Sequence, residues 1–236
     1  MKHIGSTLAT AACLLIALAP AQEPKAKTEI KRELAAWGQA VDPDGDCKFF
    51  LADGALLISV PGSDTPHDLA AEIHVTNAPR VLQPVMGDFT LQVKIDGRFE
   101  PGDESTKPGR TGYNGAGITA IADADNVVTL ARAVLQHPGE EAVPYANFEI
   151  RTGGQLQRIG LTGDHPLPKK GPVFLRLERR GSKMIGAVST QGVSWDVLGA
   201  KDIPAAWPKG LRVGAIAIST SKDEFNPRFS NLQLLR

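Results

Sequence analysis

Short segments in which apolar and polar residues alternate recur along most of this chain, and they constrain its fold more than any other feature. The clearest is DFTLQVKID, residues 88–96, in which every second residue is apolar. Such alternation predicts a strand with one buried face, because successive side chains of a strand point to opposite sides. Similar segments occur at residues 55–60, 116–122, 127–135, 145–151, 173–180, 183–190, 211–220 and 229–235.

Turn-forming sequences separate these segments. The chain contains 24 glycines and 17 prolines, many of them in short stretches such as PGSDTP, PGDESTKPGR and STQG. Glycine and proline supply the backbone angles that tight turns require. A long helical period is missing after the N-terminal leader. Many short strands with frequent turns predict an all-β fold, a two-sheet antiparallel β-sandwich or jelly roll.

The first 21 residues have the features of a secretory signal peptide. Lys2 gives a basic start, Leu8 to Leu18 is largely apolar, and an A-x-A pattern ends at Ala21. An uncleaved membrane anchor is the alternative, but the apolar run is shorter than the about 20 residues that a span needs. We therefore expect cleavage after Ala21 and a secreted or periplasmic protein without membrane insertion.

Composition limits the remaining possibilities. Residues 22–35 are charged and lack aromatic side chains, which predicts a flexible lead-in, and residues 36–236 are uniform enough to form one β-sandwich domain. The chain balances 26 basic against 26 acidic residues, so nothing attracts it to nucleic acid. Signal cleavage also removes Cys13 and leaves Cys47 alone, which excludes an internal disulfide.

The sequence DPDGDC, which begins at Asp42, has two interpretations. Asp42, Asp44 and Asp46 alternate like the first ligands of an EF-hand, yet the glycine expected at position six is absent. A calcium site of another shape with these three ligands is one reading. The other is a turn that leads into two strands joined at Asp53-Gly54. The sequence leaves both open and predicts no other cofactor.

The sequence lacks the catalytic motifs that would support an enzyme. Neither the glycosidase pattern E-x-D-x-x-E nor the serine pattern G-x-S-x-G occurs. The fingerprint-like GAGITA, from Gly115, continues as a strand rather than opening a helix. Glu149 has Arg151 at the next position on the same strand face, which favours the ionised carboxylate, whereas a general acid must hold a proton. Carboxylates from separate strands can still converge, so a glycosidase is the one enzymatic class to test.

The strand YANFEIR carries the most informative polar face. Its apolar residues would face the core, which leaves Tyr145, Asn147, Glu149 and Arg151 together on the other side. One aromatic ring and three hydrogen-bonding groups in a row suit a sugar. A solvated outer face is the alternative.

Several longer segments carry a family resemblance: WGQAVDPDGDCKFFLADGALLISVPG, NAPRVLQPVMGDFTLQVKI, YNGAG, NFEIRTGG and LRLERRG. From Trp37 to Leu235 the chain resembles the DUF1349 proteins of the concanavalin A-like lectin/glucanase superfamily, most closely the secreted planctomycete-type members. The resemblance implies a curved concanavalin A-like jelly roll and carbohydrate handling. Two positions depart from the family pattern, since Gln191 replaces an aspartate and Val127 replaces an aromatic residue.

We therefore expect a secreted, lectin-like module that holds a polysaccharide or other glycan on the concave sheet face. Tyrosines would stack on sugar rings, and the planar polar groups would pair with hydroxyls. The candidate ligand-binding residues are His67, Arg80, Tyr113, Asn114, Arg132, Tyr145, Asn147, Glu149 and Arg151. A glycoside hydrolase or lyase, and an envelope interaction domain without a small ligand, are the alternatives. The sequence identifies neither the glycan nor the oligomeric state.

Overall fold

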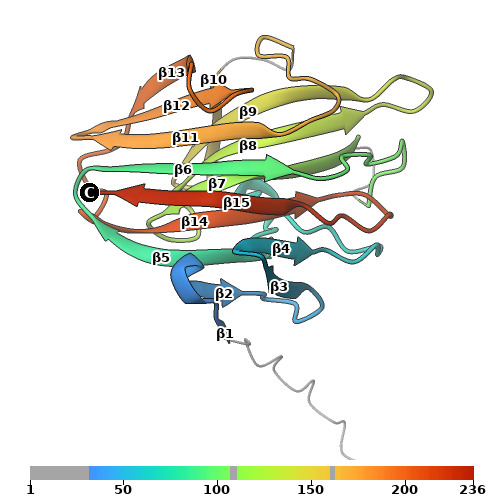
Figure 1. The fold of residues 1–236 in the computed structure, drawn as a ribbon, viewed down its shortest axis with the longest axis horizontal. Helices are drawn as coiled ribbons and strands as arrows, with labels where there is room; N and C mark the ends of the chain where they lie inside the picture. The colour runs from blue at the N-terminus through green and yellow to red at the C-terminus, as the bar shows by residue number, and fades with distance from the viewer. Residues whose placement is uncertain (1–31, 107–110, 160–162) are drawn as a thin grey trace, which may run out of the picture.

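The computed structural model describes residues 32–106, 111–159 and 163–236, which form two stacked antiparallel sheets (Figure 1). The predicted all-β, two-sheet jelly roll is confirmed. Within the described ranges, helix is limited to two 3-10 turns, η1 (Ala35–Trp37) and η2 (Ala71–Ile73). The predicted signal peptide and most of the lead-in lie outside the described residues.

The larger sheet has eight strands in the order β1-β2-β5-β14-β7-β8-β9-β10. Their bounds, in that order, are Arg32–Glu33, Gln39–Val41, Arg80–Met86, Gly210–Ser219, Gly112–Ile121, Val127–Gln136, Val143–Thr152 and Gln155–Ile159. Strands β7 to β10 follow one another in the chain and form a meander. Strand β14 comes from near the C-terminus and pairs between β5 and β7, which joins distant parts of the sequence.

The smaller sheet has seven strands in the order β13-β12-β11-β6-β15-β4-β3. Their bounds, in that order, are Asp196–Asp202, Lys183–Ser189, Val173–Arg180, Phe89–Asp96, Arg228–Leu235, Ala55–Ser59 and Lys48–Ala52. Strands β3 and β4 meet at Asp53 and Gly54, whose φ angles are 51° and 72°. Two successive positive φ angles are those of a two-residue type I′ turn, so the hairpin predicted at this position is confirmed.

The core lies between the two sheets and follows the predicted alternation. The apolar residues of β6 belong to it, as do Ala146, Phe148 and Ile150 of β9. The polar residues of β9 therefore face away from the core, on the outer side of the eight-stranded sheet. Alternation did not indicate β5, β10 and β13, nor β1 and β2, which have only two and three residues. Strand β5 contains Pro84, and β10 and β13 are edge strands with few buried side chains.

The packed structure begins earlier than the predicted domain boundary at residue 36. Strand β1 pairs with β2 through Arg32 and Glu33. Leu34 is buried and belongs to the core. The last residues of the predicted lead-in are therefore part of the sandwich.

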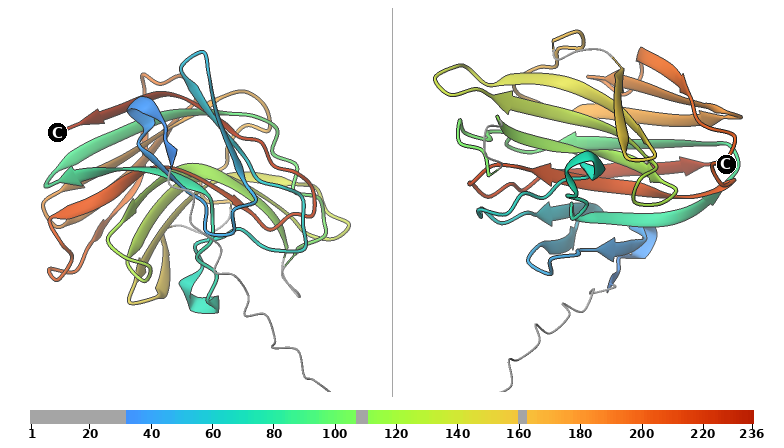
Figure 2. Two further views of the ribbon diagram at one scale, coloured as in Figure 1. Left: turned by 90° about the horizontal axis from the view of Figure 1, so that it is seen from below. Right: turned by 180° about the vertical axis from the view of Figure 1, so that it is seen from behind.

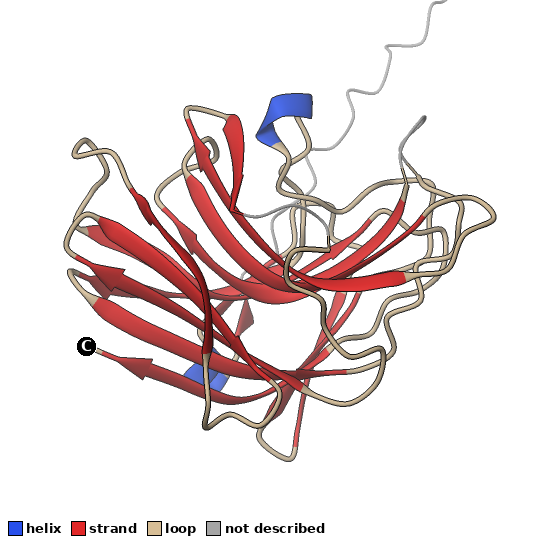
Figure 3. Ribbon diagram, turned by 90° about the horizontal axis from the view of Figure 1, so that it is seen from above, coloured by secondary structure: helices blue, strands red, loops and turns tan. Residues whose placement is uncertain are grey.

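Residues 61–79, which we call the covering segment, connect β4 to β5 across the outer face of the eight-stranded sheet. Figure 3 shows the strands curving toward the side on which η2 stands, and in the left view of Figure 2 η2 and the β9–β10 hairpin project from that same side. A second apolar cluster holds the segment in place: Leu69, Ala78, Leu82, Ile121, Val127, Ile216 and Ile218. The outer face of the eight-stranded sheet is therefore its concave face, and the covering segment and the β9–β10 hairpin rise at two sides of it.

None of the helices in the described ranges has the length and apolar character needed to cross a lipid bilayer.

Candidate functional site

A pocket of about 250 Å³ opens on the concave face between the covering segment and the β9–β10 hairpin. Its polar lining comprises Asp68, Glu72, Thr111, Tyr113, Tyr145, Asn147, Glu149, Arg151, Arg158 and Thr220. Its apolar lining comprises Ala70, Ile73, Leu135 and Ile218. The pocket lining is therefore mostly polar. It draws on five strands, on the covering segment, and on Thr111 and Thr220, which flank β7 and β14.

Strand β9 provides the floor of this pocket. Its outward residues Tyr145, Asn147, Glu149 and Arg151 all line the pocket, although each is only 5–8% exposed. Polar side chains buried to this degree cost free energy unless they are hydrogen-bonded. A row of them at alternate positions therefore needs partners, and the structure provides them.

Four charged side chains, which we call the ion-pair chain, run across the floor: Glu72, Arg151, Glu149 and Arg158. Arg151 donates from Nε and Nη2 to the two carboxylate oxygens of Glu72, at 2.9 and 3.3 Å. Its Nη1 donates to Glu149 Oε2 at 3.0 Å. Arg158 Nε donates to Glu149 Oε1 at 2.9 Å. The chain joins the covering segment to both strands of the hairpin.

Arg151 stays charged at the centre of this chain. Burial opposes its charge, but the hydrogen bonds that it donates to Glu72 and the charges of Glu149 and Glu72 outweigh burial and hold the pKa of Arg151 above its ordinary value. Both oxygens of Glu149 are occupied by guanidinium donors. The floor is accordingly a preorganised polar surface.

Tyr113, from β7, supplies an aromatic ring beside this floor. Asn147 donates from Nδ2 to the Tyr113 hydroxyl oxygen at 3.2 Å. The ring lies over Gly115, where a Cβ atom would come within 2.7 Å of that oxygen. Burial, followed by the nearby Tyr145 and Glu149, raises the pKa of Tyr113 well above its ordinary value. The phenol stays protonated and acts as a hydrogen-bonding group and not as a base.

The structure brings five predicted residues together in the pocket, namely Tyr113 and the four of β9. It places Arg132 elsewhere. Arg132 lies opposite Ala146, a core residue, and so points to the other side of the sheet. Its guanidinium donates to the carbonyl oxygen of Gly171 at 2.6 Å and stands 4.5 Å from the centre of the Phe99 ring. Burial lowers the pKa of Arg132. This residue holds a loop in place.

Three other predicted residues also lie outside the pocket lining. Asn114 donates to Ser219 Oγ at 3.1 Å, between β7 and β14. Arg80 donates to the carbonyl oxygen of Ala78 at 2.7 Å and so holds the end of the covering segment. His67, within that segment, points toward the DPDGDC loop.

Three charged pocket residues were not predicted: Asp68, Glu72 and Arg158. Arg158 lies directly opposite Glu149 in the β9–β10 hairpin. The TGG turn after β9 could have predicted that Arg158 pairs with Glu149, because a short turn fixes the register of the two strands that it joins. Asp68 and Glu72 come from a loop far away in sequence, and no local pattern connects them to β9.

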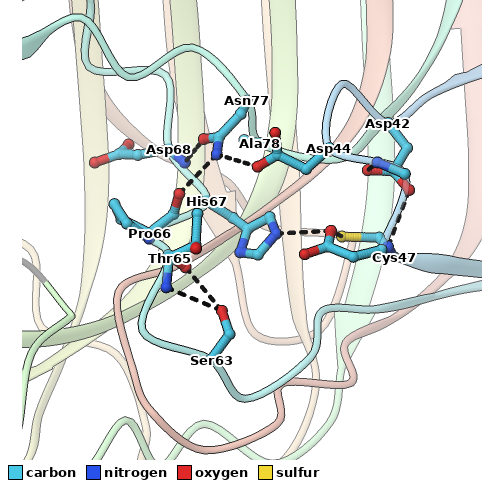
Figure 4. Close-up of polar contacts among 12 residues, drawn as sticks. Asp42, Asp44, Cys47, Ser63, Thr65, Pro66, His67, Asp68, Asn77 and Ala78 are labelled. Carbon is cyan, nitrogen blue, oxygen red and sulfur yellow. Dashed lines mark hydrogen bonds and ion pairs between the residues drawn. The ribbon is translucent and has the colours of Figure 1, made fainter. Parts of the chain in front are cut away.

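The three aspartates of the DPDGDC loop contact three different groups, and Figure 4 labels Asp42 and Asp44. Asp42 accepts the backbone N–H groups of Gly45 and Cys47, at 3.1 and 2.9 Å, which closes a turn. Asp44 Oδ2 accepts a hydrogen bond from the side-chain amide of Asn77, with an N–O distance of 2.7 Å. Asp46 lies 3.1 Å from His67 Nε2. These contacts hold the three carboxylates within the protein. Calcium binding by the three carboxylates stays a prediction.

Cys47, the last residue of this loop, lies in a negative environment. Burial, together with the charges of Asp42 and Asp46, raises the pKa of the Cys47 thiol. The thiol is therefore not an activated nucleophile, because the thiolate is the reactive form. The side chains of Asp46, Cys47 and His67 offer ligand atoms that all lie within 4.8 Å of one another.

Together, the fold and the site define a jelly-roll β-sandwich with a polar, partly enclosed pocket on its concave sheet. Solved structures share this architecture. A functionally unknown protein from Saccharomyces cerevisiae matches with a TM-score of 0.61 at 15% identity, over 84% of this chain and 95% of that chain. The GH43 BlXynB protein from Bacillus licheniformis matches with a TM-score of 0.59 at 18% identity, over 84% of this chain.

A xylan beta-1,4-xylosidase from Bacillus halodurans C-125 matches with a TM-score of 0.56 at 15% identity, over 92% of this chain. This chain spans only 36% of the BlXynB chain and 41% of the xylosidase chain. At such identities the similarity shows the fold alone. No protein-family model matches the sequence, and no curated protein matches it.

Proposed function

We propose that this protein is a secreted carbohydrate-binding module of the DUF1349 type, which holds a sugar unit of a glycan in the pocket on its concave sheet. The observation that carries the proposal is the outward row of β9, whose polar side chains are largely buried and yet line an open pocket. A pocket of this kind exposes hydrogen-bonding groups that are already fixed in place, so little conformational entropy is lost on binding.

The volume and the lining of the pocket support a site for one sugar ring. Its volume of about 250 Å³ is below the roughly 300–1,000 Å³ of drug-sized ligand sites, which favours a single unit of a longer glycan. Tyr113 offers an aromatic surface, the buried Asn147 offers an N–H donor, and the Arg158 side chain, which is 53% exposed, offers others. Flat apolar contact combined with planar donors and acceptors is the combination that recognises pyranose rings.

Charge narrows the class of sugar. The pocket is lined by three carboxylates, Asp68, Glu72 and Glu149, and by two guanidinium groups, Arg151 and Arg158. A uronic acid would add a further negative charge to a lining that already has an acidic excess, which is unfavourable. The proposal therefore specifies a neutral sugar. The similarity in fold to a xylan beta-1,4-xylosidase makes xylan the first glycan to test.

The contacts of two of the three pocket carboxylates, Glu72 and Glu149, favour binding over hydrolysis. Hydrolysis of a glycoside requires one carboxylic acid that can give up a proton and a second carboxylate across the bond. Glu72 and Glu149 both direct both of their oxygens to guanidinium groups. Neither is arranged as a proton donor.

Isothermal titration of the mature chain with xylan oligosaccharides, and with a panel of other neutral and acidic glycans, tests the proposal. We expect a dissociation constant between millimolar and tens of micromolar, about 4–6 kcal/mol of binding free energy. Tyr113→Ala should weaken binding by at least about tenfold, or 1.4 kcal/mol. Gln92→Ala, on the outer face of the other sheet, is the matched control and should bind like the wild type.

The result that contradicts the proposal is absence of binding to every glycan tested, or equal binding by Tyr113→Ala and the wild type. Release of reducing sugar during the titration would instead favour the glycosidase.

A further inference from the structure

Three side chains of different chemistry meet at the edge of the covering segment: the carboxylate of Asp46, the thiol of Cys47 and the imidazole of His67. Figure 4 shows the His67 ring directed at the loop that carries the other two. These groups come from two separate segments, and the backbone of His67 is held by reciprocal hydrogen bonds with Ser219, each 2.9 Å long. The arrangement is thus built by the fold.

Two of the three donor separations are close to those around a tetrahedral zinc ion, and all three lie within 4.8 Å. Zinc lies about 2.0–2.2 Å from oxygen, 2.0–2.1 Å from nitrogen and 2.3 Å from sulfur. In a tetrahedron these bond lengths separate a nitrogen from an oxygen by about 3.3 Å, and an oxygen from a sulfur by about 3.6 Å. The observed separations are 3.1 Å between His67 Nε2 and Asp46 Oδ1, and 3.5 Å between Asp46 Oδ1 and Cys47 Sγ.

The donor set selects zinc over calcium. Calcium binds six to eight oxygen atoms, whereas thiolate and imidazole are ligands of zinc. The negative charges of Asp42 and Asp46, which disfavour a thiolate beside them, become favourable when a divalent cation lies among the three ligands. Asp42 also accepts the Cys47 backbone N–H, so it holds the loop in the conformation that presents the sulfur.

The cluster is reachable from solvent on one side and anchored on the other. The Asp46 side chain is 37% exposed, and the His67 side chain is 1% exposed. An ion can therefore enter past Asp46 and meet a ligand that is already fixed. Three protein ligands leave the fourth tetrahedral position to water.

We propose that Asp46, Cys47 and His67 bind a zinc ion that fastens the covering segment to the DPDGDC loop. The next residue after His67 is Asp68, which lines the pocket. The ion would accordingly hold one wall of the pocket in position. The site itself does not depend on what the pocket binds.

Cobalt substitution tests this site directly. The mature protein is stripped of metal with a chelator, desalted and titrated with Co²⁺, and Zn²⁺ is then added as competitor. We expect the intense visible bands of tetrahedral cobalt together with a near-ultraviolet thiolate-to-cobalt charge-transfer band, both removed by Zn²⁺. Cys47→Ser should abolish the charge-transfer band and weaken Co²⁺ binding at least about a hundredfold, because loss of an outer-shell partner alone costs about 10- to 100-fold.

Two further variants keep the test decisive. Asp46→Asn changes a partly exposed ligand and should weaken Co²⁺ binding even if Cys47→Ser folds poorly. Asp44→Asn is the matched control, because it removes one charge from the same loop and still offers an oxygen to Asn77. It should bind Co²⁺ like the wild type, and circular dichroism in chelator checks that each variant is folded.

A wild-type spectrum without a thiolate band, or one that Cys47→Ser leaves unchanged, would overturn the proposal. Stabilisation by Ca²⁺ that depends on Asp44 and not on Cys47, without a thiolate band, would overturn it in favour of the calcium loop.

Discussion

Replacement of Arg151 by methionine tests whether the ion-pair chain is held together as its geometry indicates. Arg151 contacts Glu72 and Glu149 at once, and its side chain is 6% exposed. Methionine keeps most of the apolar stem while it removes the guanidinium. The change therefore isolates the charge interactions and leaves the packing of the strand largely intact.

The expected cost follows from what each carboxylate loses. Removal of one member of a buried ion pair costs about 3–5 kcal/mol, because a buried charge is left without its partner. Here Glu149 keeps Arg158, and the Glu72 side chain is 33% exposed and can be hydrated. Both circumstances reduce the penalty, so we expect Arg151→Met to lower the free energy of unfolding by about 2–3 kcal/mol.

Urea denaturation at neutral pH measures this change, with the slope m unaltered if the folded and unfolded states keep their compactness. The double variant Glu149→Gln with Arg151→Met removes both buried charges. It should be less destabilised than the sum of the two single variants, since the uncompensated carboxylate is gone. A loss below about 0.5 kcal/mol for Arg151→Met, or strictly additive costs, would refute the coupling that the distances imply.

Two further predictions concern Tyr113. In the folded protein the pKa of Tyr113 lies above its ordinary value. The folded state therefore keeps the phenol proton at a pH at which the unfolded chain has released it. The stability that this group contributes is fully present below about pH 10 and is lost as the pH rises further. Tyr113→Phe should flatten this alkaline decline in unfolding free energy, and an equal decline in both proteins would contradict the burial of the phenol. Gly115→Ala should displace the ring, since the new Cβ would lie 2.7 Å from the hydroxyl oxygen. We expect weaker glycan binding by titration with an unfolding free energy within about 1 kcal/mol of the wild type, because alanine itself favours the strand by about 0.5–1 kcal/mol.

Much of the fold was predictable from local pattern. Alternation in residues 88–96 and 145–151 indicated strands, and it also identified which side chains face the core. It failed where burial is slight or a proline intervenes, as in β10, β13 and β5. Edge strands pack on fewer neighbours, so their sequences carry less of the period-two signal on which the prediction rests.

The candidate site was predictable only in part. The outward row of β9 could be predicted because alternate side chains of one strand point to opposite faces. Arg132 shows the limit of that reasoning. Strand β8 is apolar on both faces, so the alternation of its side chains does not decide which face meets the core. Glu72 and Asp68 approach β9 only because the covering segment crosses the concave sheet, and His67 approaches Cys47 for the same reason.

By itself, then, the amino-acid order determined where strands form and which side of each is apolar, because the alternation of side chains is a property of a single strand. Only the tertiary structure decided which strands lie side by side, which polar face is closed over into a pocket, and which buried charges meet. These depend on contacts between residues distant in the chain, and such contacts exist only once the two sheets have closed on their common core.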